Sequence, residues 1–131
     1  MLRKAMLVRR KKDWAAHMDV LCKDIQKWVS EERGKWSVQA SGKKKIEQQE
    51  IGTYSLPRLT IKTPGGRIQL EPVGMDLFTG EGRVDFYASP SFRRLLLVDT
   101  GKGWKLRTDS GIEWPHKWSK NEFFEVVKAI I

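Results

Sequence analysis

The residues best suited to bind another molecule are the basic side chains at the start of the chain. Six of them fall within residues 1–12 with no acidic residue between them: Arg3, Lys4, Arg9, Arg10, Lys11 and Lys12. The other 119 residues contain 19 Lys and Arg against 16 Asp and Glu, so most of the net charge of +9 lies in this basic arm. Clustered positive charges attract anions because their fields add. The arm therefore predicts an anionic partner, and nucleic acid is the first choice because each neutralised phosphate releases counterions.

A second basic cluster follows in Arg33, Lys35 and the run Lys43, Lys44 and Lys45, again without an intervening acid. It adds to the predicted nucleic-acid interface only if it shares a face with the arm. The run at 43–45 also suits the edge of a sheet, where lysines prevent association with other strands. The edge role is favoured over nucleic-acid binding for this run.

Residues that could perform catalysis are few. His17, His116 and Cys22 are the only histidines and cysteine, and their spacing matches neither a zinc site nor a Cys-His nucleophile pair. The segment 99–103 (DTGKG) lacks the first glycine of a phosphate-binding loop. We therefore expect a non-catalytic protein without a cofactor or metal.

The alternative enzyme reading is a metal-dependent nuclease, because carboxylates can hold the metal ions that cleave phosphodiesters. Asp85, with Lys105 on a later strand, is the most nuclease-like pair. The carboxylates that could contribute are Glu71, Asp76, Glu81, Asp85 and Asp99. Several of these are ordinary turn residues, which favours a structural role.

Composition limits the class of protein. A chain of 131 residues fits one domain, and its hydrophobic content of 40% is sufficient for a core. A single cysteine excludes an internal disulfide, and no apolar stretch is long enough to cross a bilayer. The start does not resemble a signal peptide, so we expect a cytoplasmic protein.

Apolar periodicity predicts a helix from about Asp13 to Arg33, ended by Gly34. Its buried face would carry Trp14, Met18, Leu21, Ile25 and Trp28. Leu2 and Met6 would extend this stripe backwards, so the arm could continue the helix. Arg10, however, falls where the stripe needs an apolar residue, which argues against burial there.

From residue 35 to about 114 the period changes to 2, which predicts five to seven short antiparallel strands. Ser41-Gly42 is expected to form a turn, and residues 63–66 (TPGG) a type II turn with glycine at a positive φ. Residues 95–98 (LLLV) are apolar on both faces, typical of a strand covered above and below.

The last element has the clearest signals. Ser119 and Glu122 are spaced as a capping box, and Trp118 and Phe123 as a hydrophobic staple, so a helix should begin just after Ser119. The predicted fold is thus α+β: a basic arm over residues 1–12, then one domain over 13–131 with a helix, an antiparallel meander and a capped helix.

The favoured function is a non-catalytic binding module that engages nucleic acid through the arm, mainly at phosphates. The competing hypothesis is a protein-interaction or regulatory subunit, in which the stripe from Trp14 to Trp28 or a sheet edge meets another chain or a second copy. Six tryptophans could include a base-stacking platform, although most fit core positions. Trp114, before Pro115, is the one with no evident place in a core.

Overall fold

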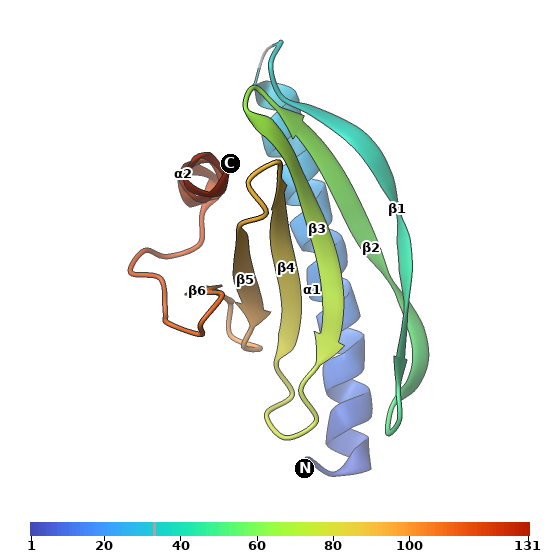
Figure 1. The fold of residues 1–131 in the computed structure, drawn as a ribbon. Coiled ribbons are helices and arrows are strands. Elements are labelled where there is room, and N and C mark those ends of the chain that lie inside the picture. The colour runs from blue at the N-terminus through green and yellow to red at the C-terminus, as the bar shows by residue number, and fades with distance from the viewer. Residues whose placement is uncertain (33) are drawn as a thin grey trace.

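The computed structural model describes residues 1–32 and 34–131; Arg33 of the second basic cluster lies outside them. A long helix is followed by a six-stranded antiparallel meander and a second helix (Figure 1). The predicted α+β order is confirmed, with six strands inside the expected range. The elements are α1 (Lys4–Glu31), β1 (Ser37–Gln48), β2 (Gly52–Thr63), β3 (Gly66–Met75), β4 (Gly82–Ser89), β5 (Arg94–Asp99), β6 (Trp104–Thr108) and α2 (Lys120–Ile130).

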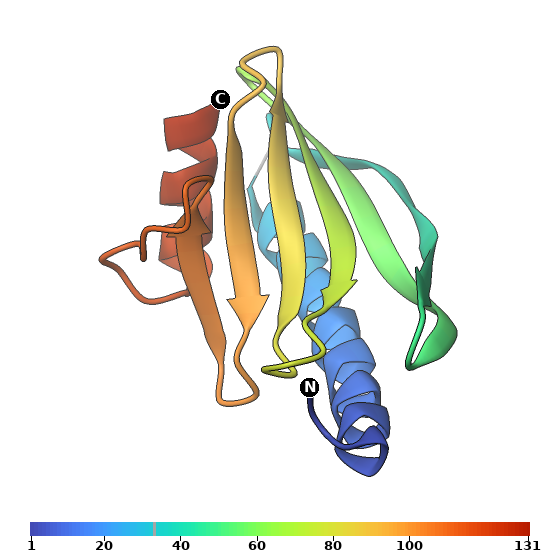
Figure 2. The same cartoon turned by 60° about the horizontal axis from the view of Figure 1, so that its bottom comes forward.

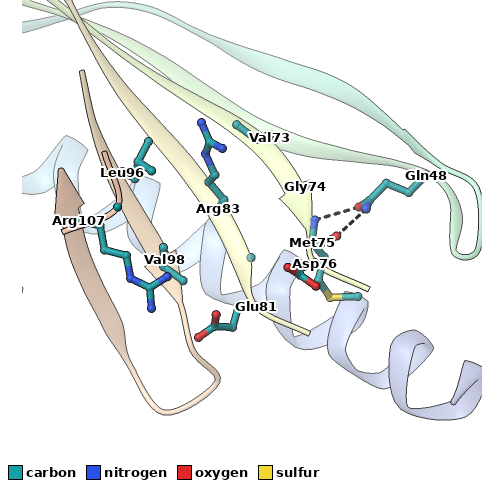
Figure 3. A pocket seen from close by; sticks show the side chains of 12 residues that line it. Gln48, Val73, Gly74, Met75, Asp76, Glu81, Arg83, Leu96, Val98 and Arg107 are labelled. Atoms are coloured by element: carbon teal, nitrogen blue, oxygen red, sulfur yellow. Dashed lines mark hydrogen bonds between the residues drawn. The ribbon is translucent and has the colours of Figure 1, made fainter. Parts of the chain in front are cut away.

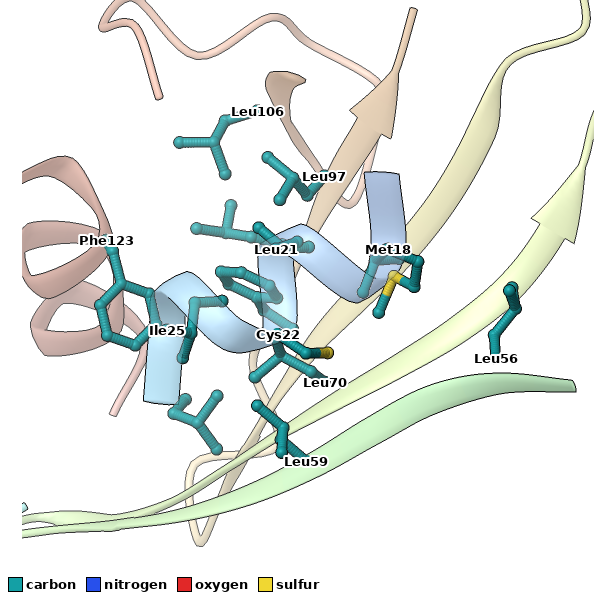
Figure 4. Packing of buried hydrophobic residues seen from close by; sticks show 14 of the residues in the cluster. Met18, Leu21, Cys22, Ile25, Leu56, Leu59, Leu70, Leu97, Leu106 and Phe123 are labelled. Carbon is teal, nitrogen blue, oxygen red and sulfur yellow. The ribbon is translucent and has the colours of Figure 1, made fainter. Parts of the chain in front are cut away.

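Both helices pack on the same face of the sheet (Figure 2). Met18, Leu21 and Ile25 of α1 meet apolar side chains that alternate along the strands (Figure 4). The helices also contact each other, since the rings of Trp28 in α1 and Phe123 in α2 lie 5.9 Å apart. The core is therefore a single layer between the helices and the inner face of the sheet, formed on the strand side by Leu59, Ile61, Ile68, Leu70, Val84, Phe86, Leu97 and Leu106.

Helix α1 begins at Lys4, so the predicted start at Asp13 was wrong. Leu7 is only 1% exposed and extends the buried stripe by two turns, which anchors the first turns to the domain. Arg10 is also half-buried, contrary to expectation. The basic arm is thus largely part of the helix.

Two predicted turns need correction. β1 runs straight through Ser41 and Gly42, which pair with Leu59 and Arg58 of β2. At the β2–β3 turn, Gly65 does not adopt the positive φ that a type II turn requires. A Cβ there would lie 2.6 Å from Cγ2 of Ile131, so close packing explains this glycine.

Strand β5 is buried on both faces, as the sequence predicts, but among the residues that the structure describes no second layer of helices covers its outer face. Leu96 and Val98 point outward and are 9% and 6% exposed. Their cross-strand neighbours include Arg83 of β4 and Arg107 of β6. The aliphatic stems of such long charged side chains can shield apolar neighbours while their guanidinium groups remain in water.

The start of α2 confirms half of the capping box. Ser119 Oγ accepts the backbone N–H of Glu122 at 3.1 Å, and the rings of Trp118 and Phe123 lie 6.0 Å apart as the staple predicts. The carboxylate of Glu122 accepts the indole N–H of Trp114 at 2.6 Å. This hydrogen bond fixes Trp114, the tryptophan for which the sequence predicted no core position.

Candidate functional site

Two cations of the basic arm are used within the fold. Arg10 Nε donates to the carbonyl of Gly80 at 2.9 Å, and its guanidinium lies 3.7 Å from the buried carboxylate of Asp99. Lys11 Nζ donates to the carbonyl of Ile51 at 3.0 Å and lies 5.7 Å from the centroid of the Tyr54 ring. These two side chains hold loops of the sheet against α1 and are half-buried.

The other four cations of the arm are exposed and make no ion pair within the part of the chain that the structure describes: Arg3, Lys4, Arg9 and Lys12. Successive helical residues are rotated by about 100°, so these side chains point in several directions around α1. Arg9 and Lys12 share the outward side, whereas Lys4 lies on the flank with Lys11. The arm is therefore a diffuse positive field rather than one patch.

Lys43, Lys44 and Lys45 lie on the edge strand β1, away from the exposed side of α1. Lys44 pairs with Glu71 at 3.8 Å, and Lys45 pairs with Glu47 at 3.3 Å. The prediction that this run lies at a sheet edge is confirmed.

Four of the five carboxylates considered for a nuclease already have partners: Glu71, Asp76, Asp85 and Asp99. Asp85 accepts two bonds from Arg83 at 2.8 and 3.0 Å, and Lys105 pairs with Glu113 at 3.4 Å. Asp99, only 1% exposed, contacts His17 Nδ1 at 2.7 Å. Across residues 1–32 and 34–131, no three His, Cys, Asp or Glu side chains gather closely enough to hold a metal ion.

A cavity of about 1080 Å³ runs beside β6, the edge strand opposite β1. Three tryptophans line it, together with basic residues. We call it the aromatic groove and define it by Trp104, Trp114, Trp118, Lys102, Lys105, Arg107, His116 and Lys117. Glu81 and Glu113 are its acidic members, so Lys and Arg outnumber the acids by four to two.

The three rings of the aromatic groove are fixed by contacts behind them. Trp104 packs against Trp14 with ring centroids 6.0 Å apart, and Trp118 against Phe86 at 5.7 Å. The third ring, Trp114, is held by its bond to Glu122. All three tryptophans are half-buried and line the groove. The groove therefore presents aromatic surface in a fixed arrangement, close to Lys and Arg.

The groove cannot be recognised in the sequence. Its tryptophans come from β6 and from the segment before α2, and only folding brings them together. Two signals pointed toward it: Trp114 had no core position, and Lys102, Lys105 and Lys117 interleave with the three tryptophans.

No family model, curated protein or solved structure matches this chain. Within the described residues, no helix has the length and apolar character needed to cross a membrane.

Proposed function

We propose that the protein is a non-catalytic module that binds nucleic acid through the aromatic groove. The observation that carries this proposal is the joint presence of Trp104, Trp114 and Trp118 with four Lys and Arg side chains in one cavity. Aromatic rings stack on bases of any sequence, and neighbouring cations neutralise phosphates. Such a site combines affinity with little sequence preference.

The basic arm has a supporting role in this proposal. Arg3, Lys4, Arg9 and Lys12 are exposed and point in different directions, which suits long-range attraction better than a shaped contact. They would raise the rate of association and make it sensitive to salt. This differs from the sequence-based hypothesis, in which the arm itself was the binding site.

Tryptophan fluorescence can test the proposal directly. We expect a fifteen-nucleotide oligothymidylate to quench the emission of the protein at 50 mM salt, because bases stacking on the groove rings change their surroundings. Binding should weaken steeply as salt rises, because counterions are released. Absence of both quenching and a gel-mobility shift at 50 mM salt would overturn the proposal.

Two matched variants separate the groove from general effects of losing a tryptophan. Trp114→Leu removes a groove ring, and we expect about a tenfold loss of affinity. Trp36→Leu is the control, since Trp36 is also half-buried but packs on Phe124, outside the groove. Thermal melts of both variants would show whether each remains folded. Equal losses in the two variants would argue against the groove.

A second candidate, a protein-interaction subunit, is supported by strand β1. Residues 37–43 are exposed on both faces, and β1 has a neighbour in the sheet only on its β2 side. Another strand could add to this edge through backbone hydrogen bonds. The stripe from Trp14 to Trp28 is a weaker choice, because Trp14 is fully buried. Light scattering at several protein concentrations would detect self-association through β1.

A further inference from the structure

The aromatic groove continues onto the outer face of the sheet. Arg107 and Glu81 line it and also line a second cavity of about 440 Å³ (Figure 3). This second cavity has an apolar floor formed by Val73, Leu96 and Val98, with Arg83 beside it. We call it the outer groove. A ligand passing from one cavity to the other would cross Arg107.

Arg107 differs from two basic residues near it, Arg83 and Lys105. Arg83 is held by Asp85 through two hydrogen bonds, and Lys105 is paired with Glu113. Arg107 is half-buried, yet the described residues place no carboxylate in ion-pair contact with it. Its guanidinium therefore retains its donors for a ligand.

The backbone around Arg107 is fixed on both sides. Arg107 pairs with Leu96 of β5 in the sheet and forms an isolated bridge with Glu113 on the other side. A guanidinium on a rigid strand can bind a phosphate with two parallel N–H donors at little entropic cost. The fixed position of Arg107 and the chemistry of its guanidinium therefore both suit binding of a phosphate group.

We infer that the ligand is single-stranded rather than duplex nucleic acid, with a backbone phosphate bound by Arg107 between the two grooves. This inference rests on the proposed function. The groove rings are anchored in the domain, so they can stack only on bases that are free of a double helix. Bases on one side of the phosphate would lie in the aromatic groove, and the strand would continue over the apolar floor of the outer groove.

Fluorescence anisotropy with the oligothymidylate and with a duplex of the same length tests the strand preference. At 100 mM salt we expect the single strand to bind about tenfold more tightly, because duplex bases cannot reach the rings. Equal or tighter binding of the duplex would overturn this inference while leaving nucleic-acid binding itself intact. No binding of either would overturn the proposed function as well.

Arg107→Gln tests the phosphate contact, with Arg67→Gln as the matched control. Arg67 is exposed at the far end of β3 and loses the same charge outside both grooves. We expect Arg107→Gln to weaken single-strand binding about tenfold and to reduce the slope of log K against log salt by about 0.7, the value for one phosphate. Arg67→Gln should change neither by as much.

Arg107→Lys shows whether a loss of affinity comes only from a folding defect. Lysine keeps the positive charge and the aliphatic stem beside Leu96, so this variant should stay folded. It should preserve the melting temperature and the salt slope but lose part of the affinity, since lysine lacks the two-pronged geometry. If Arg107→Gln, Arg107→Lys and Arg67→Gln all bind the single strand like the unmodified protein, Arg107 does not hold a phosphate and the inference fails.

Discussion

At the scale of single residues, Gly82 leaves no room for a side chain beside the ring of Trp14. A Cβ built on Gly82 would lie 2.2 Å from Cε3 of the indole, and Trp14 is fully buried. Gly82 begins β4, so neither the strand nor the ring can move away easily. The backbone conformation is not the reason for glycine here, because its φ is not positive. Glycine is needed for space.

We therefore expect Gly82→Ala to lower the free energy of unfolding by about 1–3 kcal/mol, the usual cost of overpacking a core. Gly42→Ala is the matched control, since no atom lies within 4 Å of a Cβ at that strand position. It should be neutral or stabilise by up to about 1 kcal/mol, because alanine restricts the unfolded chain. Urea denaturation of both variants measures the difference, and equal values would contradict the packing argument.

Cys22 offers a second test at this scale. Burial, with a smaller effect of Asp19, raises the pKa of its thiol from 9.0 to about 12. Because only the thiolate reacts quickly, the native protein should resist a disulfide reagent at pH 8 and react after addition of urea. Fast labelling without denaturant would contradict this burial.

The same shift has a consequence for stability. Between pH 9 and about 12 the unfolded chain releases the thiol proton while the folded chain retains it. Rising pH through this range therefore favours the unfolded state, and this contribution to stability is lost as alkali is added.

At the scale of elements, the segment before α2 does more than start a helix. The Glu122 carboxylate that would complete a capping box binds the indole of Trp114 instead. The hydroxyl of Ser119 still satisfies the backbone N–H at the third position of α2. The cap and one wall of the aromatic groove are thus built by the same short segment, which links the fold of α2 to the shape of the candidate site.

At the scale of the whole molecule, the two faces of the sheet are stabilised differently. The inner face is covered by α1 and α2 (Figure 2). Within residues 1–32 and 34–131, no helix covers the outer face, which carries a network of ion pairs, including Arg94 with Asp85 and Asp109, and Glu71 with Arg58. An open face of this kind leaves room for grooves that a second helical layer would fill.

The start of α1 joins three connections at one end of the molecule (Figure 1). The backbone N–H of Leu2 donates to Leu77, Arg10 contacts Gly80 and Asp99, and Lys11 donates to Ile51. These partners lie in or beside the β3–β4, β5–β6 and β1–β2 connections. The basic arm is therefore a structural part of the domain.

Deletion of residues 1–12 should lower the free energy of unfolding by about 3 kcal/mol or more, because it exposes the surroundings of buried Leu7 and removes these bonds. The deletion alone is thus a poor test of nucleic-acid binding. The control is a variant with Gln at Arg3, Lys4, Arg9 and Lys12, which should keep its stability within about 0.5 kcal/mol per site. Equal denaturation midpoints for the deletion and the unmodified protein would contradict the structural role of the arm.

The sequence by itself determined the α+β class, the capped second helix, the alternation of the strands and the edge position of Lys43 to Lys45. These features depend on local spacing, which can be read along the chain. Only the tertiary structure decided that Arg10 and Lys11 are used internally, that three tryptophans share one groove, and that Arg107 lacks an ion-pair partner within the described residues. These features involve residues that lie far apart in the sequence. They depend on which connections of the meander lie at the same end of the molecule, and local spacing does not determine this.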